Sequence, residues 1–222
     1  MIALAIFDLA GTTVRDDGQV VRAFRAALAG HGIAIGEEEV AGVRGASKRQ
    51  AIEALIPDGP DRHSRAEGVY TSFRERLAEE FESVPARAAE GAEEIFRDLR
   101  TAGVCVALNT GFDREITDRL LDSLGWRDGR ADTIVCGDDV ARGRPAPDLI
   151  LRAMADTGVG DPGTVGAVGD TALDLEAGAK AGVRWNVAVC GGAHERERLE
   201  RAPHTHIVDS LSALPAIWRV EK

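Results

Sequence analysis

Short apolar runs recur along the chain and alternate with helical patterns. The runs occupy residues 2–7, 104–109, 133–136, 164–168 and 186–190, and a turn signal follows each of them. Runs of this length predict buried strands. Their alternation with helices is typical of a parallel sheet covered by helices. We therefore predict an α/β fold.

Residues 15–85 have a different pattern. Apolar residues recur at helical spacing in Val20–Leu28, Lys48–Ile56 and Tyr70–Phe81, and the stretch shows no strand-like alternation. The segment 57–60, Pro-Asp-Gly-Pro, separates two of these helices. We interpret the stretch as an all-helical insert between the first strand and the rest of the sheet.

This interpretation sets the domain boundaries. Residues 1–14 and 86–222 are predicted to form the core, and residues 15–85 the helical insert. Hinges between the two are expected near Val14–Gly18 and Ser83–Arg87.

Composition narrows the classes of function. The chain has 222 residues and a formal net charge of -10, which argues against binding to nucleic acid, because phosphate backbones require an excess of Lys and Arg. Its apolar runs are too short for a membrane span, and residues 1–7 do not resemble a signal peptide. The widely spaced Cys105, Cys136 and Cys190 are interpreted as buried, reduced thiols of a cytoplasmic protein.

Polar residues stand where the predicted strands end. Asp8, Thr110, Asp170 and the pair Asp138–Asp139 each follow an apolar run. Open parallel sheets bind ligands at the carboxyl ends of their strands, so these side chains are expected to converge. Asp138 and Asp139 can equally be loop or helix caps. His204 and His206, beside a last predicted strand at Ile207–Val208, are interpreted as surface histidines.

The converging residues suit phosphoryl transfer. Asp8, followed by a turn at Gly11–Thr12, is placed as a nucleophile above backbone N–H groups. Arg144, in Gly-Arg-Pro, can balance the negative charge of a phosphoryl group, and the hydroxyl of Thr110 can donate to it. Asp8 and Asp170 offer the hard oxygen ligands that Mg²⁺ prefers. Asp174, one helical turn beyond Asp170, can face the same site.

The order of these motifs resembles the haloacid dehalogenase superfamily. Asp8, Thr110, Arg144 and Gly169–Asp170 with Asp174 match its four motifs, and the resemblance covers nearly the whole chain. It implies a Rossmann-like core with a helical cap, attack by Asp8, an aspartyl-phosphate intermediate and its hydrolysis. It also implies that the Ala10 carbonyl binds Mg²⁺ together with Asp8, Asp170 and Asp174, and that Gly11, Thr12 and Gly111 bind substrate.

The residue at position 10 indicates which branch of the superfamily the chain resembles. Phosphatases of the family carry an acid there that protonates the leaving group, whereas this chain has Ala10. Asp-Leu-Ala-Gly-Thr-Thr resembles the phosphonatase branch, which cleaves the P–C bond of phosphonoacetaldehyde. That branch uses a lysine of the cap to form a Schiff base with the aldehyde. Lys48 falls at the position of that lysine, and an imine there removes the need for an acid at position 10.

Two departures from the phosphonatase pattern keep alternatives open. Ala51 stands where that branch has a histidine, and Phe112 where it has a tyrosine. Lys48 can therefore form an imine, bind substrate without covalent chemistry, or be a solvated lysine. A nucleophilic lysine needs a lowered pKa, to which the neighbouring Arg44 and Arg49 can contribute.

The leading hypothesis is thus a Mg²⁺-dependent hydrolase that acts on a small organophosphorus metabolite. A phosphomonoester phosphatase of the phosphoglycolate-phosphatase type is the alternative within the same family. A protein that only binds a phosphorylated ligand is the rival from another class. The resemblance leaves a homodimer formed through the helical cap open.

Overall fold

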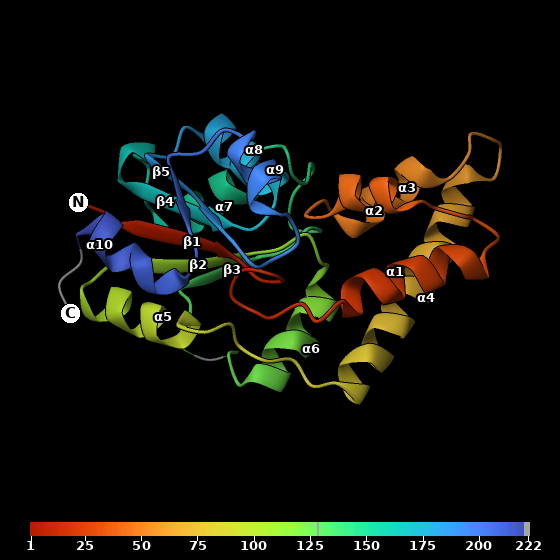
Figure 1. Ribbon diagram of the computed structural model, residues 1–222, viewed down its shortest axis with the longest axis horizontal. Helices are drawn as coiled ribbons and strands as arrows, with labels where there is room; N and C mark the ends of the chain where they lie inside the picture. Colours follow the sequence, from red (N-terminus) through yellow and green to blue (C-terminus); the bar gives the residue numbers. More distant parts are fainter. Residues whose placement is uncertain (128, 220–222) are drawn as a thin grey trace.

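The structure, a computed structural model, describes residues 1–127 and 129–219. Its centre is one six-stranded sheet in the order β3-β2-β1-β4-β5-β6, and every pairing in it is parallel. Figure 1 shows the sheet at one end of the molecule and a group of helices at the other. The strands are β1 (Leu4–Asp8), β2 (Cys105–Asn109), β3 (Thr133–Val135), β4 (Val165–Gly169), β5 (Trp185–Val189) and β6 (His206–Val208).

Helices cover both faces of the sheet (Figure 1). Contacts place α7 (Asp148–Thr157) and α8 (Ala172–Ala181) against the strands on one face. On the other face lie α5 (Ala92–Thr101) and α10 (Leu214–Trp218). The remaining helices of this part are α6 (Arg114–Leu124) and α9 (Arg196–Glu200), with single 3₁₀ turns at Pro162–Thr164 and Leu211–Ala213.

The middle strand explains why both faces must be covered. All five residues of β1 are buried, as expected for a strand that is apolar on both sides. Its Phe7 packs edge-on against Phe96 of α5 and Trp218 of α10, with ring centroids 5.3 and 6.0 Å apart. The buried residues of α5 recur at helical spacing, so one stripe of that helix faces the sheet.

Four helices lie between β1 and α5, and we call them the helical insert. They are α1 (Gln19–Gly30), α2 (Glu37–Val43), α3 (Lys48–Leu55) and α4 (Arg62–Ser83). Three match the helices predicted from spacing, although α4 begins eight residues earlier than Tyr70. The helix α2 is not predicted from the sequence, because its residues Glu-Glu-Glu-Val-Ala-Gly-Val show little apolar periodicity.

The two connections between the insert and the sheet lie side by side. The Arg15 N–H donates to the Arg87 carbonyl at 2.9 Å, and the Ala89 N–H donates to the Thr13 carbonyl at 2.8 Å. The predicted hinges are therefore neighbours in space. The division into a core and a separate cap domain stays a prediction.

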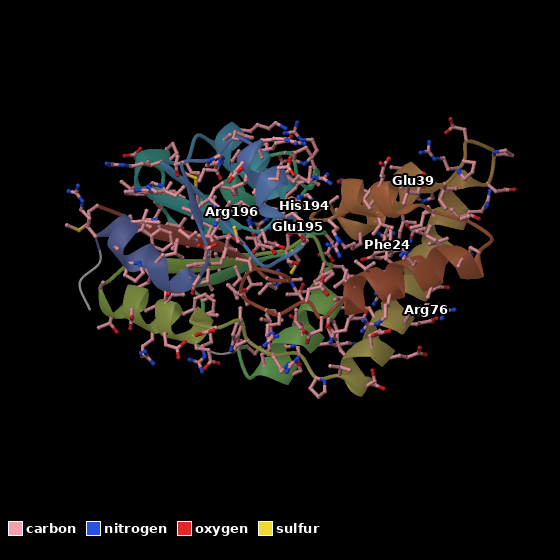
Figure 2. All side chains as sticks on the ribbon, viewed as in Figure 1. Phe24, Glu39, Arg76, His194, Glu195 and Arg196 are labelled. Atoms are coloured by element: carbon pink, nitrogen blue, oxygen red, sulfur yellow. The ribbon has the colours of Figure 1, made fainter. Side chains whose placement is uncertain are left out.

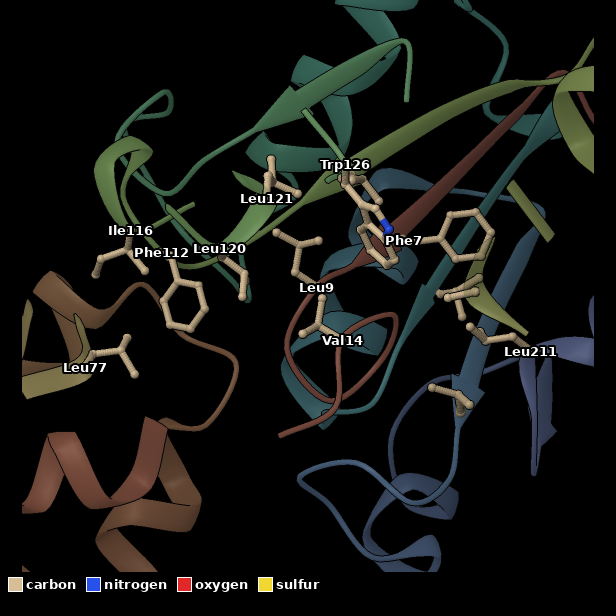
Figure 3. Close-up of a cluster of buried hydrophobic side chains, with 14 of the residues drawn as sticks. Phe7, Leu9, Val14, Leu77, Phe112, Ile116, Leu120, Leu121, Trp126 and Leu211 are labelled. Atoms are coloured by element: carbon tan, nitrogen blue, oxygen red, sulfur yellow. The ribbon is translucent and has the colours of Figure 1, made fainter. Parts of the chain in front are cut away.

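Packing joins the insert to the core at a second place. The Tyr70 hydroxyl of α4 donates to Asp113, the N-cap of α6, at 2.6 Å. Figure 3 shows Phe112 and Ile116 beside Leu77 of α4 at this boundary, and all three belong to one cluster of buried apolar side chains. The insert therefore rests on the loop that follows β2.

The structure also bears on the smaller predictions. Each of the five predicted apolar runs overlaps a strand, and β6 is the expected last one. The cysteines form no disulfide, but only Cys136 is buried, whereas Cys105 and Cys190 are half-buried. His204 and His206 are exposed, as predicted. Over the described residues, no helix is both long and apolar enough to cross a membrane.

Candidate active site

The predicted site residues lie at the carboxyl ends of three adjacent strands. Asp8 ends β1, Thr110 follows the end of β2, and Asp170 follows the end of β4. These strands are neighbours in the sheet, so residues that lie far apart in the sequence meet at one edge. Asp138 and Asp139 serve the next loop instead. Both accept hydrogen bonds around Arg114 at the start of α6.

Arg144 connects the carboxylates. Its side chain is 3% exposed, and its guanidinium contacts Asp8 and Asp174, each at 2.8 Å. A further N–H donates to Asn109 Oδ1 at 2.5 Å. Burial opposes its charge, but Asp174 and Asp8 raise the pKa of Arg144 above its usual value. Arg144 is therefore a fixed cation whose donors are already engaged by the protein.

Asp170 is held by two loops. The Thr12 hydroxyl donates to Oδ1 at 3.1 Å, and the Ala193 N–H donates to Oδ2 at 2.6 Å. Both loops approach so closely that a Cβ on Gly11 or Gly192 would lie 2.1 or 2.2 Å from the Asp170 carboxylate. The Gly-Gly pair after β5 was the overlooked sequence signal for this contact.

His194 fastens the loop after β5. Its ring Nδ1 accepts from the Ala172 N–H at the start of α8 at 3.0 Å. The backbone N–H of His194 donates to the Asp170 carbonyl at 3.3 Å. Figure 2 shows His194 on the side of the core that faces the insert. The loop from Gly191 to His194 therefore connects the site, the start of α8 and the insert.

Asp174 lies inside α8, but Asp170 precedes that helix. Thr171 is the N-cap, and it forms a capping box with Asp174 at the third helical position. The expected one-turn helical relation between the two acids is wrong, because α8 begins at Ala172. They nevertheless share one site, since one Asp174 oxygen contacts Arg144 and the other accepts from Thr171.

Thr110 is buried with its hydroxyl oriented by the backbone. Its oxygen accepts the Phe112 N–H at 3.1 Å, which leaves the hydroxyl proton available to donate. Thr110 and Gly111 line the same cavity as Asp8. This placement suits a hydrogen bond to an oxygen of a bound phosphoryl or phosphonyl group.

Mg²⁺ fits the chemistry of the carboxylates. Burial, with repulsion from Asp174, raises the pKa of Asp8 to about 7 in spite of Arg144. Burial, with repulsion from Asp8 and Asp174, raises the pKa of Asp170 well above its usual range. A divalent cation relieves this repulsion. Among the described residues, no three His, Cys, Asp or Glu side chains surround one point, so carbonyl and water ligands would complete the shell.

Lys48 reaches the same cavity from the insert. It is the first residue of α3 and only 9% exposed. Its Nζ donates to the Ala46 carbonyl at 3.2 Å and lies 5.9 Å from the centre of the Phe112 ring. Burial, helped by Arg144, lowers the pKa of Lys48 to about 8, although Asp8 opposes this. Lys48 therefore has an appreciable neutral fraction near neutral pH.

The cavity between the insert and the sheet is small, about 50 Å³. Asp8, Ala10, Lys48, Thr110, Gly111, Arg144 and Asp170 line it, so most of the predicted site residues share one space. Two further charged residues, Asp16 and Arg44, line it as well. Arg49 does not, because it stacks 4.3 Å above the Tyr70 ring and pairs with Glu67.

A larger cavity of about 540 Å³ lies between α4 and α6. None of the predicted site residues lines it. We place the candidate active site in the smaller cavity, because that is where the charged and hydrogen-bonding groups converge.

Comparison with known proteins agrees with this geometry. Residues 2–182 match the haloacid dehalogenase-like hydrolase family. The chain belongs to the haloacid dehalogenase-like hydrolases. The matched range contains all four predicted motifs, so the hydrolase predicted from sequence is confirmed at the level of family, fold and enzyme class.

Curated relatives of this hydrolase are named phosphonoacetaldehyde hydrolase. The protein from Bordetella pertussis is 29% identical over 255 residues, covering 96% of this chain and 89% of the relative. The protein from Bacillus cereus is 30% identical over 210 residues, covering 87% and 78%. These relatives support the predicted resemblance to the phosphonatase branch.

Solved structures show the same fold. A hydrolase from Pseudomonas syringae superposes with a TM-score of 0.86 at 22% identity, covering 99% of this chain and all of that one. A phosphonoacetaldehyde hydrolase-like protein from Oleispira antarctica gives 0.83 at 23% identity, covering 100% and 95%. At these identities the likeness concerns the fold alone.

Proposed function

We propose that this hydrolase cleaves the P–C bond of phosphonoacetaldehyde or a related compound through an aspartyl phosphate on Asp8. The observation that carries the proposal is the position of Lys48. A buried lysine with a pKa lowered to about 8 shares a cavity of about 50 Å³ with the carboxylate of Asp8. The names of the curated relatives support the same substrate class.

In this proposal Lys48 makes the carbon a leaving group. Its neutral amine attacks the carbonyl carbon, and loss of water gives a protonated imine. An Asp8 oxygen then attacks phosphorus, and the electron pair of the breaking P–C bond moves into the imine to give an enamine. Protonation of the enamine carbon and hydrolysis release the aldehyde and restore Lys48. Water attacks the aspartyl phosphate to release phosphate and restore Asp8.

The other residues orient the reacting groups and balance their charge. Arg144 holds the attacking Asp8 carboxylate at 2.8 Å and opposes the rise in the pKa of Asp8 that burial causes. The Thr110 hydroxyl donates to a phosphonyl oxygen, and the insert excludes bulk water from the cavity. Asp8, Asp170 and the Ala10 carbonyl would hold Mg²⁺, with Asp174 completing the predicted set. When bound, Mg²⁺ neutralises charge between the substrate and the nucleophile.

The test is phosphate release from phosphonoacetaldehyde in the presence of Mg²⁺, measured beside a panel of small phosphate esters. We expect release from the phosphonate, and we expect Lys48→Arg to abolish it, because a guanidinium cannot form the imine. Lys180→Arg is the matched control, since Lys180 is exposed and pairs with Glu176 on α8. Release from esters alone would overturn the proposal.

A phosphomonoester phosphatase is the second candidate. Buried Ala51 on α3 favours it, because the histidine of the phosphonatase pattern is missing there. Asp16 in the cavity could then protonate the leaving group in place of an acid at position 10. Ala10→Asp separates the two candidates: it should raise activity on esters but leave imine-dependent cleavage without gain.

Two further predictions accompany the proposed function. A location in the cytoplasm follows from the spacing of the cysteines, and a homodimer follows only from resemblance. Size-exclusion chromatography with light scattering would test the dimer.

A further inference from the structure

Two cations of the insert form one wall of the site. Arg44, the C-cap of α2, and Lys48, the first residue of α3, both line the site cavity. Both also line a second cavity of about 20 Å³ inside the insert, whose other lining residues are apolar: Val20, Val21, Phe24, Val40 and Val43. Arg44 and Lys48 thus lie where the catalytic cavity meets apolar side chains of the insert, of which Val20 and Val21 line both cavities.

These two cations are partnered differently from Arg144. Arg144 contacts two carboxylates, whereas the Arg44 guanidinium donates to the Ala193 carbonyl at 2.5 Å. Among the side chains that the structure describes, no carboxylate lies within 4 Å of either Arg44 or Lys48. The acid on their side of the cavity, Asp16, accepts the Gly18 N–H at 2.9 Å.

A guanidinium in this position is suited to an anion. Arginine has five N–H donors in a fork that matches a carboxylate. Arg44 uses one of them in its hydrogen bond to the Ala193 carbonyl. The apolar residues behind it lower the local polarity and strengthen a charge-assisted hydrogen bond. The transferred group is expected at Asp8, so Arg44 faces the carbon end of the substrate.

We propose that Arg44 binds a carboxylate of the substrate, next to the carbonyl carbon that meets Lys48. The substrate class is then a compact phosphono-2-oxo acid rather than a simple aldehyde. This inference rests on the proposed function for the role of Lys48. The cavity of about 50 Å³ restricts the carbon skeleton to a few atoms.

Binding of unreactive ligands tests the carboxylate site without any chemistry. 3-Phosphonopropanoate and 3-phosphonopropanamide have nearly the same shape, and only the first carries a carboxylate, which lies at the position of the carboxylate of the oxo acid. Calorimetry with Mg²⁺ should show that the wild-type protein binds 3-phosphonopropanoate on the order of 10- to 100-fold more tightly than the amide. Arg44→Met should reduce this ratio to near one, and Arg44→Lys should restore part of it.

The matched control is Arg65→Met. Arg65 is an exposed arginine of α4 in the same insert, outside the cavity lining, so the ratio should stay at the wild-type value. Arg44 also ties the insert to Ala193, so loss of the tie alone would weaken both ligands equally. A ratio near one in the wild-type protein, or equal weakening of both ligands in Arg44→Met, would overturn the inference.

Turnover separates this inference from the proposed function. The specificity constants for 3-phosphonopyruvate and phosphonoacetaldehyde are compared in the wild-type protein and in Arg44→Met. We expect a preference for the oxo acid that Arg44→Met removes. Cleavage of the aldehyde with equal or greater efficiency overturns the carboxylate site but keeps the P–C hydrolase. Absence of cleavage of both overturns the proposed function, and the calorimetric ratio then still decides for or against Arg44.

Discussion

The two walls of the small cavity hold their charges in different ways. On the sheet side, Arg144 contacts Asp8 and Asp174, each at 2.8 Å. On the insert side, Arg44 and Lys48 donate only to backbone carbonyls among their described hydrogen bonds. The sheet wall holds its charged groups in fixed ion pairs, whereas the insert wall keeps cationic donors for a ligand.

The difference follows from how each wall is built. Parallel strands place Asp8 and its neighbours on rigid elements, so their positions are set by the sheet. The insert meets the sheet through a few polar contacts, such as the Lys48 N–H with the Gly111 carbonyl at 3.3 Å and Gln50 with the Gly143 N–H at 3.3 Å. We therefore expect the nucleophile and its cation on the fixed wall, and the imine-forming Lys48 and the selectivity for the carbon end of the substrate on the insert wall.

The sharpest test of the sheet wall is Asp8→Asn. The amide keeps the size of the side chain but cannot act as the nucleophile, so phosphate release should fall about 10⁴-fold or more. Asp17→Asn is the control, because Asp17 is an exposed carboxylate that pairs with Arg87. Steady-state assays of the two variants side by side measure the effect. Full activity of Asp8→Asn would disprove the covalent role of Asp8.

Removing Arg144, the cation that Asp8 and Asp174 share, should lower both stability and activity. Arg144→Met leaves Asp8 and Asp174 buried without their partner, so the free energy of unfolding should fall by about 3–5 kcal/mol and kcat by about 10³-fold. Urea denaturation and phosphate release measure the two effects. The exposed Arg142, which pairs with Asp148, provides the control Arg142→Met. An unchanged stability would show that the carboxylates do not depend on Arg144.

Pushing the walls apart should affect turnover more than stability. A Cβ on Gly111 would lie 2.6 Å from the Ala46 carbonyl oxygen, so Gly111→Ala should displace the insert near Lys48. Displacements of about 1 Å can lower a rate about 10²-fold. Gly160→Ala, where nothing lies within 4 Å, is the control. Equal kcat/KM values for the two variants would argue that the contact at Gly111 is not needed.

The smallest expected effect is the pH dependence of kcat/KM and of stability that arises from Lys48 in the insert wall. Lys48 must be neutral to attack, and its pKa is about 8, so imine-dependent kcat/KM should rise about tenfold between pH 7 and pH 9. The folded pKa lies below the usual value of 10.5, so the unfolded chain binds more protons in that window. Stability should therefore rise from pH 8 to pH 10.5, and Lys48→Met should lose this increment.

Much of the sheet and its chemistry could be predicted because the signals are local. The apolar run before Asp8 and the Gly-Asp pair at 169–170 mark strand ends directly in the sequence. The helix α2 was missed because three glutamates and a glycine hide its periodicity. The helical relation of Asp170 to Asp174 was wrong, since the capping-box pattern Thr171-Ala-Leu-Asp174, which makes Thr171 the N-cap of α8, was overlooked.

The family and the α/β fold could be predicted from the sequence alone, and the same motifs give the set of residues that we propose to transfer a phosphorus group. Strand signals, turn signals and motifs all depend on residues that are neighbours in the sequence, and they can therefore be recognised along the chain. Only the tertiary structure decided that Arg44 and Asp16 line the cavity while Arg49 turns away. It also decided that burial lowers the pKa of Lys48. These properties arise from segments far apart in the chain packing together, and desolvation exists only once they have packed.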